Sequence, residues 1–510
     1  MQVPEGPENG TIEKLTERKD DEKMGVLSGL EPQSVFYYFE EMTKIPHGSG
    51  NVDRISDYLE EFARERNLFC IQDECKNVII VKEATNGYEK EPAVILQGHM
   101  DMVAVKKPDC DIDMKTEGLR VAVDGDKIYA EGTSLGGDDG IAVAYALALL
   151  DSDTIKHPRL EVVITVDEEV GMDGARMIDL SMLQGKRMLN LDSEEEGIFL
   201  TSCAGGARAN CHLPLQTENG NGVTYEVTVG GLLGGHSGAE IHKERGNSNC
   251  LFGRLLWAIS KQVPVRLVSV NGGLADNAIP RETKAVLALA AEDAKQYEEV
   301  LFQVIEKVAA DVKEELATKD PDIYIRTEKG SDGSFVSITT KDTRKAAAFL
   351  WSLPNGVQAM SADMPGLVET SLNLGILKSD ETGLQADFSV RSSVESAKEA
   401  LIDKVKTVTE LAGGSVELSG DYPGWKYRVH SPLREKMVAL YEKMYGVAPK
   451  VEAIHAGLEC GLLGSKIEDL DCVSFGSQMS DIHTTEETLS ISSTKRVWEY
   501  LVRLLEEKDQ

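Results

Sequence analysis

The sequence predicts an α/β protein whose mixed, mostly parallel sheet is flanked by helices and whose first domain is interrupted by an inserted α/β domain. Short apolar runs alternate with helical segments in the first part of the chain, a pattern typical of sheets with parallel strands. After about Gly206 the pattern changes to alternating strands and a long amphipathic helix. The length of 510 residues also favours more than one domain.

Apolar spacing predicts the elements of the first domain. Helices are expected over residues 34–45, 52–62 and 140–150, and Pro46 ends the first of them because proline cannot continue a helix. Strands are expected at the short apolar runs over residues 77–81, 93–96, 161–166 and 188–191.

Residues 206–410 are predicted to form the inserted domain. Residues 223–230 and 386–391 alternate as half-exposed strands, and residues 297–308 carry one apolar helix face. The first domain would then comprise residues 26–205 and 411–510, because the candidate ligand His483 must rejoin ligands that precede residue 193. Its last helix is expected over residues 494–507, and residues 1–25 are expected to be a mobile N-terminal tail.

The composition disfavours several classes of partner. The formal charge is −32, from 86 acidic and 54 basic residues, and this charge repels nucleic acid and anionic membranes. The eight cysteines form no CxxC pair and are expected to be reduced thiols. No export signal is recognised, and the longest apolar run, residues 141–150, is half the length of a membrane span. We therefore expect a cytoplasmic protein without a membrane partner.

Five separated stretches carry histidine or acidic side chains that suit a divalent metal ion. They are residues 97–101 (QGHMD), 135–140 (LGGDDG), 165–169 (TVDEE), 190–193 (NLDS) and 480–483 (SDIH). Imidazole and carboxylate groups suit zinc, and carboxylates also suit manganese. Two imidazoles with three or four carboxylates are too many for one ion with an open position, but they suit two ions that share a carboxylate.

Several of these residues follow predicted strands, where open α/β sheets hold their sites. Asp101 lies two residues after His99 on the same side of the chain, and can accept a hydrogen bond from its second ring nitrogen. A surface pair is the alternative for these two residues. Asp138 and Asp139 suit a bridging ligand, but acids that cap a helix explain them as well.

The remaining candidates also have ordinary interpretations. Glu168 and Glu169 point in different directions, so one can bind metal while the other faces a metal-bound water; a solvated acidic loop is the alternative. Asp192 directly follows a strand, whereas the three glutamates after Ser193 are expected to be solvated. His236 lies in a glycine-rich loop that allows close backbone approach to a ligand, yet taken alone it suits a structural role.

Seven motifs together resemble the zinc-dependent peptidase superfamily that includes carboxypeptidases, aminoacylases and carnosinases. The resemblance is greatest to its branch of aminoacyl-histidine dipeptidases, and it extends from about residue 30 to the end. The motifs are GHMDMV (98–103), TSLGGDDGIAVA (133–144), TVDEEVGMDGA (165–175), LNLDSEEEG (189–197), GGLLGGHSGAEIHKERGN (230–247), DNAIPRE (276–282) and AIHAGLECG (453–461). One departure is that Thr484-Thr485-Glu486 follows His483, the final candidate metal ligand, where Ser-Pro-Asp-Glu is more usual.

The resemblance implies two zinc ions per chain, with Co²⁺ or Mn²⁺ as substitutes. His99, Asp138 and Asp192 would hold one ion. Asp138, Glu169 and His483 would hold the other, so Asp138 would bridge the two.

The resemblance also implies roles around the metal ions. Asp101 would orient His99, Glu168 would be the general base, and the peptide bond between Asp138 and Asp139 would be cis. The inserted domain would be a lid that also serves dimerisation. Its substrate-binding residues would be His236, Asn277 and Arg391. Gly457 would lie in a separate substrate-binding loop beside the metals.

The implied activity is hydrolysis of dipeptides with a free C-terminal carboxylate, including Xaa-His substrates of the carnosine kind. A hydroxide held by two zinc ions would attack the peptide carbonyl, with Glu168 as general base. The expected partners are a small dipeptide substrate and, in a possible homodimer, a second copy of the chain. His236 would act either within its own chain or on the active site of that second copy. The alternatives are a deacylase of N-acyl amino acids and a peptide-binding protein without catalysis.

Overall fold

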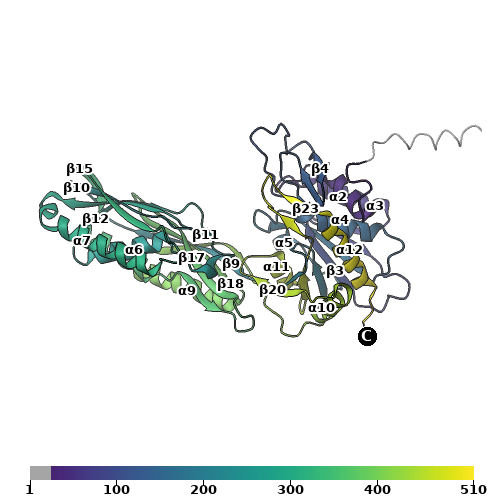
Figure 1. Cartoon of the computed structure of the whole chain (residues 1–510). Helices are drawn as coiled ribbons and strands as arrows, with labels where there is room; N and C mark the ends of the chain where they lie inside the picture. The colour runs from purple at the N-terminus through teal and green to yellow at the C-terminus, as the bar shows by residue number, and fades with distance from the viewer. Residues whose placement is uncertain (1–24, 510) are drawn as a thin grey trace, which may run out of the picture. The chain divides into compact units, whose positions relative to one another are not determined.

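The computed structural model describes residues 25–509 (Figure 1). The tail predicted over residues 1–25 lies outside the described residues except for Gly25. The described chain divides into two compact units. The first unit comprises the residues through Ile178, Leu183–Glu196 and the chain from Phe475, and the second comprises Asp179–Met182 and Gly197–Ser474.

The first unit contains a mixed sheet segment with the strand order β1-β2-β6-β3-β7. These strands are β1 (Phe69–Gln72), β2 (Val78–Lys82), β3 (Val94–His99), β6 (Leu160–Thr165) and β7 (Arg187–Asn190). β3 pairs with β6 and β7 in parallel, whereas β2 pairs with β1 and β6 antiparallel. Because β3, β6 and β7 run in one direction, their carboxyl ends meet at the same edge.

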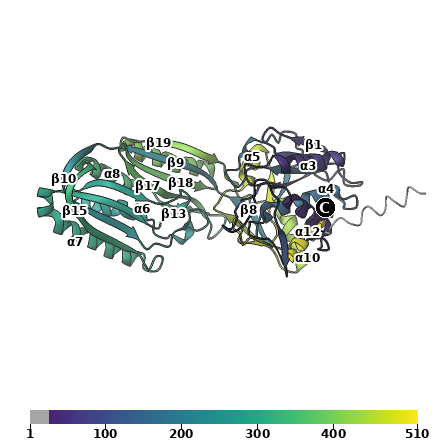
Figure 2. The same ribbon diagram turned by 90° about the horizontal axis from the view of Figure 1, so that it is seen from above.

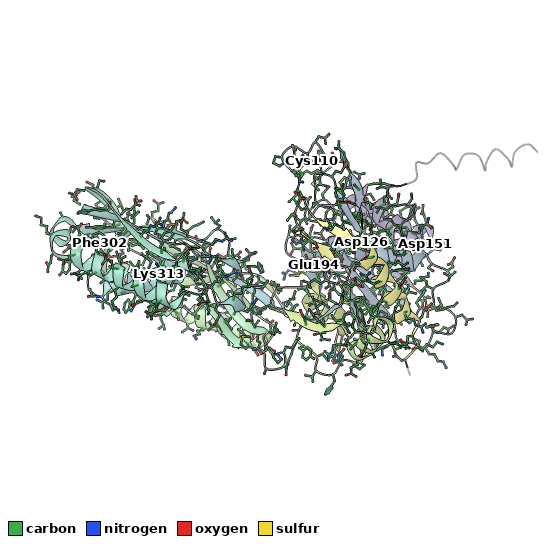
Figure 3. The ribbon with its side chains drawn as sticks, in the orientation of Figure 1. Cys110, Asp126, Asp151, Glu194, Phe302 and Lys313 are labelled. Atoms are coloured by element: carbon green, nitrogen blue, oxygen red, sulfur yellow. The ribbon has the colours of Figure 1, made fainter. Side chains whose placement is uncertain are left out.

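Helices and a small second sheet complete the first unit. The helices are α2 (Gln33–Thr43), α3 (Asp53–Glu65), α4 (Gly137–Asp151), α5 (Asp173–Met177) and α12 (Ile491–Glu506). The small sheet has the order β22-β23-β5-β4, from β4 (Val121–Asp124), β5 (Lys127–Ala130), β22 (Met479–Ser480) and β23 (Thr488–Ser490). Asp126, in the turn between β4 and β5 (Figure 3), accepts a 2.8 Å hydrogen bond from the backbone N–H of Ser492 at the start of α12.

Helix α4 is the central helix of the first unit, and every residue from Gly137 to Leu150 in it is buried. The long apolar run over residues 141–150 therefore forms part of the hydrophobic core. The helix approaches β3 closely because Gly98 has no side chain: a Cβ there would lie 2.5 Å from Asp139 Oδ2 and 2.8 Å from Ala142 Cβ.

The second unit is built on a sheet of nine strands, with the order β15-β10-β14-β12-β17-β18-β9-β19 and β16 paired to β17. These strands are β9 (Gly205–Pro214), β10 (Thr217–Gly230), β12 (Arg266–Gly272), β14 (Thr283–Ala290), β15 (Tyr324–Ile338), β16 (Gly356–Met360), β17 (Val368–Asp380), β18 (Gly383–Ser392) and β19 (Ser415–Tyr422).

Four helices share one hydrophobic core with this sheet. They are α6 (Ser248–Ser260), α7 (Ala291–Glu315), α8 (Thr340–Ser352) and α9 (Glu395–Leu411), and they lie along its strands in Figure 1 and Figure 2. Phe302 on α7 (Figure 3) packs edge-on against the buried Tyr225 of β10, with ring centroids 5.9 Å apart. The apolar face predicted for residues 297–308 is therefore the face that α7 turns to the core.

The second unit also contains shorter elements. They are β8 (Ile198–Cys203), β11 (Gly235–His236), the 3₁₀ turn η1 (Ile241–Lys243), β13 (Ala278–Ile279), α10 (Pro432–Tyr445), β20 (Lys450–Ile454), α11 (Glu459–Lys466) and β21 (Asp471–Ser474). β8 pairs with β20 in parallel and with β21 antiparallel.

The α/β class, with mixed sheets and flanking helices, is confirmed. The predicted inserted domain, residues 206–410, lies within the second unit. The assignment of residues 26–205 and 411–510 to one catalytic domain stays a prediction. None of the helices in the described part of the chain combines the length and apolar character that a membrane span requires.

We expect Gly98→Ala to lower the free energy of unfolding by about 1–3 kcal/mol, because the new methyl group would overlap Asp139 and Ala142. Gly464→Ala is the control, since nothing lies within 4 Å of a Cβ placed there on α11. Urea unfolding of both variants measures the difference. Equal stability of the two variants would show that α4 does not need a glycine opposite it.

Candidate metal centre

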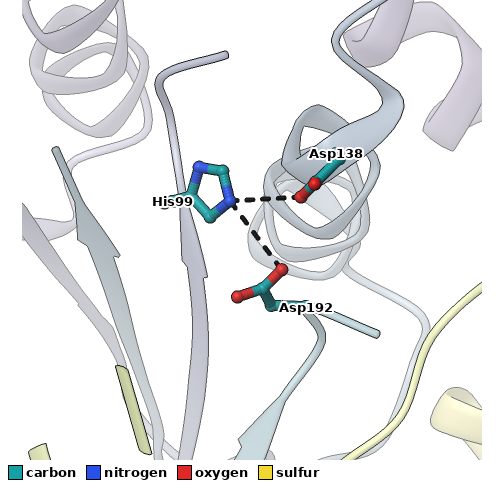
Figure 4. Close-up of side chains that lie close together, drawn as sticks. All are labelled: His99, Asp138 and Asp192. Atoms are coloured by element: carbon teal, nitrogen blue, oxygen red, sulfur yellow. Dashed lines mark hydrogen bonds and ion pairs between the residues drawn. The ribbon is translucent and has the colours of Figure 1, made fainter. Parts of the chain in front are cut away.

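Three predicted ligands of the first unit meet where parallel strands end. His99 is the last residue of β3, Asp192 lies two residues beyond the end of β7, and Asp138 lies at the start of α4. His99 Nε2 is 3.2 Å from Asp138 Oδ1 and 3.7 Å from Asp192 Oδ1 (Figure 4). The three side chains therefore point at one common position.

A second group shares Asp138 with the first. His483 Nε2 lies 3.1 Å from Asp138 Oδ2 and 2.8 Å from Glu169 Oε1. Asp138 thus presents one carboxylate oxygen to each group. The peptide bond between Asp138 and Asp139 is cis.

The nitrogen and oxygen atoms of both groups have a spacing and chemistry that suit a divalent metal ion such as zinc. Within each group the possible ligand atoms lie within 4.8 Å of one another. Nitrogen and oxygen ligands bind zinc at about 2.0–2.1 Å, so they stand roughly 3–4 Å apart around a tetrahedral ion. One imidazole and two carboxylates in each group also leave a coordination position for a substrate or water.

Asp101 organises the loop that carries the two candidate glutamates. Its carboxylate accepts hydrogen bonds from the backbone N–H of Glu168, at 3.1 Å, and of Glu169, at 3.4 Å. It also accepts a 2.8 Å hydrogen bond from the Ser49 hydroxyl. His99 Nδ1 lies 3.0 Å from the Asp101 carbonyl oxygen and 3.5 Å from its carboxylate, so Nε2 is left for a metal ion.

The acidic surroundings raise the pKa of both histidines. Hydrogen bonds to Asp138 and Glu169 raise the pKa of His483 to about 10. Burial lowers the pKa of His99, but hydrogen bonds with Asp101 and Asp138 outweigh burial and raise it well above the usual value. Both imidazoles therefore hold protons at neutral pH until a metal ion displaces them.

The carboxylates of the site respond in opposite ways. Burial, followed by the negative charge of Asp139, raises the pKa of Asp192 well above its usual value. Burial also acts to raise the pKa of Asp138, but hydrogen bonds from His483 and His99 outweigh it and hold the pKa far below the usual range. Asp138 is therefore ionised, as a carboxylate shared by two cations would have to be.

The predicted substrate-binding residues cluster within the second unit. The buried Arg391 donates a 3.1 Å hydrogen bond from Nη1 to the Tyr422 hydroxyl. A Cβ on Gly238 would lie 3.0 Å from the ring of His236 and 3.3 Å from Arg391 Nε, so these two side chains are close neighbours. Gly457 packs against the ring of Tyr422, where a Cβ would lie 2.8 Å away.

His236 has a defined hydrogen-bonding pattern. Its Nδ1 accepts hydrogen bonds from the backbone N–H groups of Gly238, at 3.2 Å, and Ala239, at 3.0 Å. Burial, followed by the positive charge of Arg391, lowers the pKa of His236. The ring is therefore neutral at neutral pH and carries its proton on Nε2. The backbone carbonyl of Asn277 accepts a 2.8 Å hydrogen bond from Ser237 and so joins this loop to the cluster.

Two residues near the candidate ligands were not identified from the sequence. The Ser49 hydroxyl donates a hydrogen bond to Asp101. The only local sign of this role in the sequence is that Ser49 stands between two glycines soon after Pro46. Glu487 is buried against the turn before Asp138, and its signal was an acid four residues after His483, where the more usual Ser-Pro-Asp-Glu also ends in glutamate. Both act through contacts that are distant in sequence.

Comparisons with known proteins show the family of this chain. Residues 95–507 match the sequence profile of peptidase family M20/M25/M40. The cytosol non-specific dipeptidase of Escherichia coli (strain K12) is 35% identical over 487 residues, which cover 95% of this chain and 99% of that protein.

Solved structures are also similar. The aminoacylhistidine dipeptidase of Vibrio alginolyticus has a TM-score of 0.88 and 36% identity, with 95% of this chain and 99% of that one covered. The aminopeptidase PepT of Bacillus cereus ATCC 10987 shares the fold, with a TM-score of 0.54, 16% identity, and 94% and 98% of the two chains covered. The resemblance predicted from the seven motifs is confirmed. The chain belongs to peptidase family M20/M25/M40.

Proposed function

We propose that this chain is a metal-dependent dipeptidase that hydrolyses dipeptides with a free C-terminal carboxylate, including Xaa-His substrates of the carnosine kind. The observation that carries the proposal is Asp138, whose two oxygens face separate imidazoles at 3.2 and 3.1 Å. Support also comes from relatives of 35% and 36% identity, which are named as dipeptidases.

The two ligand groups suit a pair of zinc ions, with Co²⁺ or Mn²⁺ as substitutes. His99 and Asp192 would complete one site, Glu169 and His483 would complete the other, and Asp138 would belong to both. When bound, the ions supply Lewis acidity toward the scissile carbonyl and the attacking water.

Glu168 is our candidate for the general base. The Asp101 carboxylate accepts hydrogen bonds from the backbone N–H groups of both Glu168 and Glu169, and these bonds hold the loop in place. The side chains of the two adjacent glutamates then point in different directions. Glu169 faces His483, so Glu168 is left to accept a proton from the attacking water and pass it to the leaving amine.

The cluster of the second unit would bind the substrate. Arg391 would bind the free carboxylate through two parallel hydrogen bonds, which favours dipeptides over internal peptide bonds. His236 would donate its Nε2–H to the carbonyl oxygen as negative charge develops there. Asn277 and the backbone of Gly457 would shape the pocket.

We also propose a domain arrangement, an assembly and a cellular location for the chain. Residues 206–410 would form a lid on a catalytic domain made of residues 26–205 and 411–510. His236 would act within its own chain or across a possible homodimer. The cytoplasm is the expected location, and the E. coli relative is named as a cytosol enzyme.

We expect the wild-type chain to cleave Ala-His or carnosine, and to lose this activity with a chelator. Glu168→Ala should lower kcat by about 10²–10⁴-fold, because the base is gone, while metal content stays near two ions per chain. Glu169→Ala should instead lose an ion. Metal analysis and initial rates measure both quantities. Retention of both ions by Glu169→Ala, with loss in Glu168→Ala, would reverse the two roles.

Zinc binding should release protons, because the metal-free imidazoles have raised pKa values and a ligand must be neutral. The apparent affinity should therefore rise with pH between about 6 and 8, by up to about tenfold per pH unit for each proton released. Calorimetry in buffers with different protonation enthalpies counts these protons. His430→Asn, at an exposed histidine, should change nothing. A flat affinity with no buffer dependence would contradict protonated ligands.

Arg391→Met should raise KM for a dipeptide by about 10–100-fold, because a charged hydrogen-bonding partner of the carboxylate is lost. The same dipeptide with an amide at its C-terminus serves as the control, and should be a poor substrate for wild type and variant alike. Steady-state kinetics on both substrates measures the effect. An equal loss on both substrates would assign Arg391 a role other than carboxylate binding.

A further inference from the structure

Glu487 is a buried carboxylate with an unusual set of partners. It is 3% exposed and lies four residues after His483, between that ligand and β23. A buried carboxylate is costly unless several hydrogen bonds compensate for the lost water. Its partners therefore indicate what the residue does.

The two oxygens of Glu487 bind four consecutive backbone N–H groups. Oε2 accepts from Leu135, at 2.7 Å, and from Gly136, at 3.1 Å. Oε1 accepts from Gly137, at 2.8 Å, and from Asp138, at 3.4 Å. The turn that carries the shared aspartate is thus bound along its whole length by one side chain.

This turn has a conformation that helix α4 alone does not enforce. Gly136 has a left-handed φ of 69°, and Asp138 and Asp139 depart from helical backbone angles. The residue before the helix provides no side-chain cap. Glu487 fills that role from a distant segment, and a Cβ on Gly137 would lie only 3.2 Å from its Oε1.

The charge of Glu487 suits a helix cap, which acids commonly form, and it also suits a role beside cations. It lies close to the acidic ligands, and repulsion among carboxylates destabilises a site that holds no cation. A neutral cap would avoid this repulsion. A carboxylate is favoured where nearby cations offset the charge and where the orientation of a ligand depends on it.

We propose that Glu487 is a positioning residue, which fixes the bridging carboxylate of Asp138 relative to His483. The inference rests on the proposed two-metal function. Glu487 and His483 lie on one short segment, so the hydrogen bonds to residues 135–138 connect two ligands of the same ion. These bonds would hold Asp138 and His483, whose facing atoms lie 3.1 Å apart, at a spacing that a shared ion can use.

Glu487→Gln tests the proposal, because it keeps the shape and replaces one acceptor oxygen by an NH₂ group that faces two N–H donors. Glu486→Gln is the matched control: it makes the same change at the next residue, which is exposed and pairs with Lys107 at 2.7 Å. Zinc affinity is measured by competition with a chelator. The absorption spectrum of the Co²⁺-loaded protein reports ligand geometry.

We expect Glu487→Gln to bind zinc about 10–100-fold more weakly and to alter the Co²⁺ spectrum, with Glu486→Gln within about twofold of wild type. Glu487→Asp, which keeps the carboxylate, should recover part of the affinity. Unchanged affinity and spectrum with a lower melting temperature would overturn the proposal and leave Glu487 as a helix cap. Failure of both Glu487 variants to fold would also overturn it.

The wild-type protein separates this inference from the proposed function. If wild type binds two zinc ions and Glu487→Gln binds them equally well, only the role of Glu487 fails. If wild type itself binds fewer than two ions, the two-metal function fails, and the inference fails with it.

Discussion

The shared carboxylate of Asp138 is the interaction on which the site depends. One oxygen faces His99 and the other faces His483, so two ligand groups are joined through a single side chain. The histidines keep Asp138 ionised although burial opposes the charge, while Asp192 is driven toward its protonated form. This balance suits a centre in which cations replace protons, since metal ions bind the neutral imidazole and the ionised carboxylate.

The fold brings these groups together by simple means. Parallel pairing of β3 with β6 and β7 carries the strand ends to one edge, and the loops that follow carry acidic candidate ligands. Gly98 lets α4 approach β3, and Gly136 allows the turn that begins the helix. Glu487 then ties this turn to the C-terminal segment that carries His483. Each contact joins segments far apart in sequence, so the centre forms only in the folded chain.

The sequence predicted the buried strands and long helices of the first unit because their apolar runs are strong, whereas it did not predict the short strands β1, β4 and β5. The strand expected over residues 93–96 is β3, and the helix over residues 140–150 is the buried part of α4. Long strands of the second unit such as β15 were not predicted, because most of β15 is exposed and its residues have little apolar alternation. The candidate ligands were found from residue type and position after strands, since metal chemistry limits both.

Other features of the site depend on contacts between residues that are far apart in the sequence, which no local sequence pattern predicts. Ser49 and Glu487 are ordinary residues in the sequence, and only the fold shows that they bind Asp101 and the turn before Asp138. The neutral tautomer of His236 likewise follows from backbone N–H groups that its loop folds back toward the ring. Hydrogen bonds of this kind carry no spacing rule that sequence analysis can use.

Anomalous diffraction at the zinc edge, from crystals of the zinc-loaded protein, tests the central claim most directly. We expect two peaks per chain, about 3.5–4 Å apart, with one Asp138 oxygen bound to each ion. A single peak, or two ions of which only one touches Asp138, would contradict it.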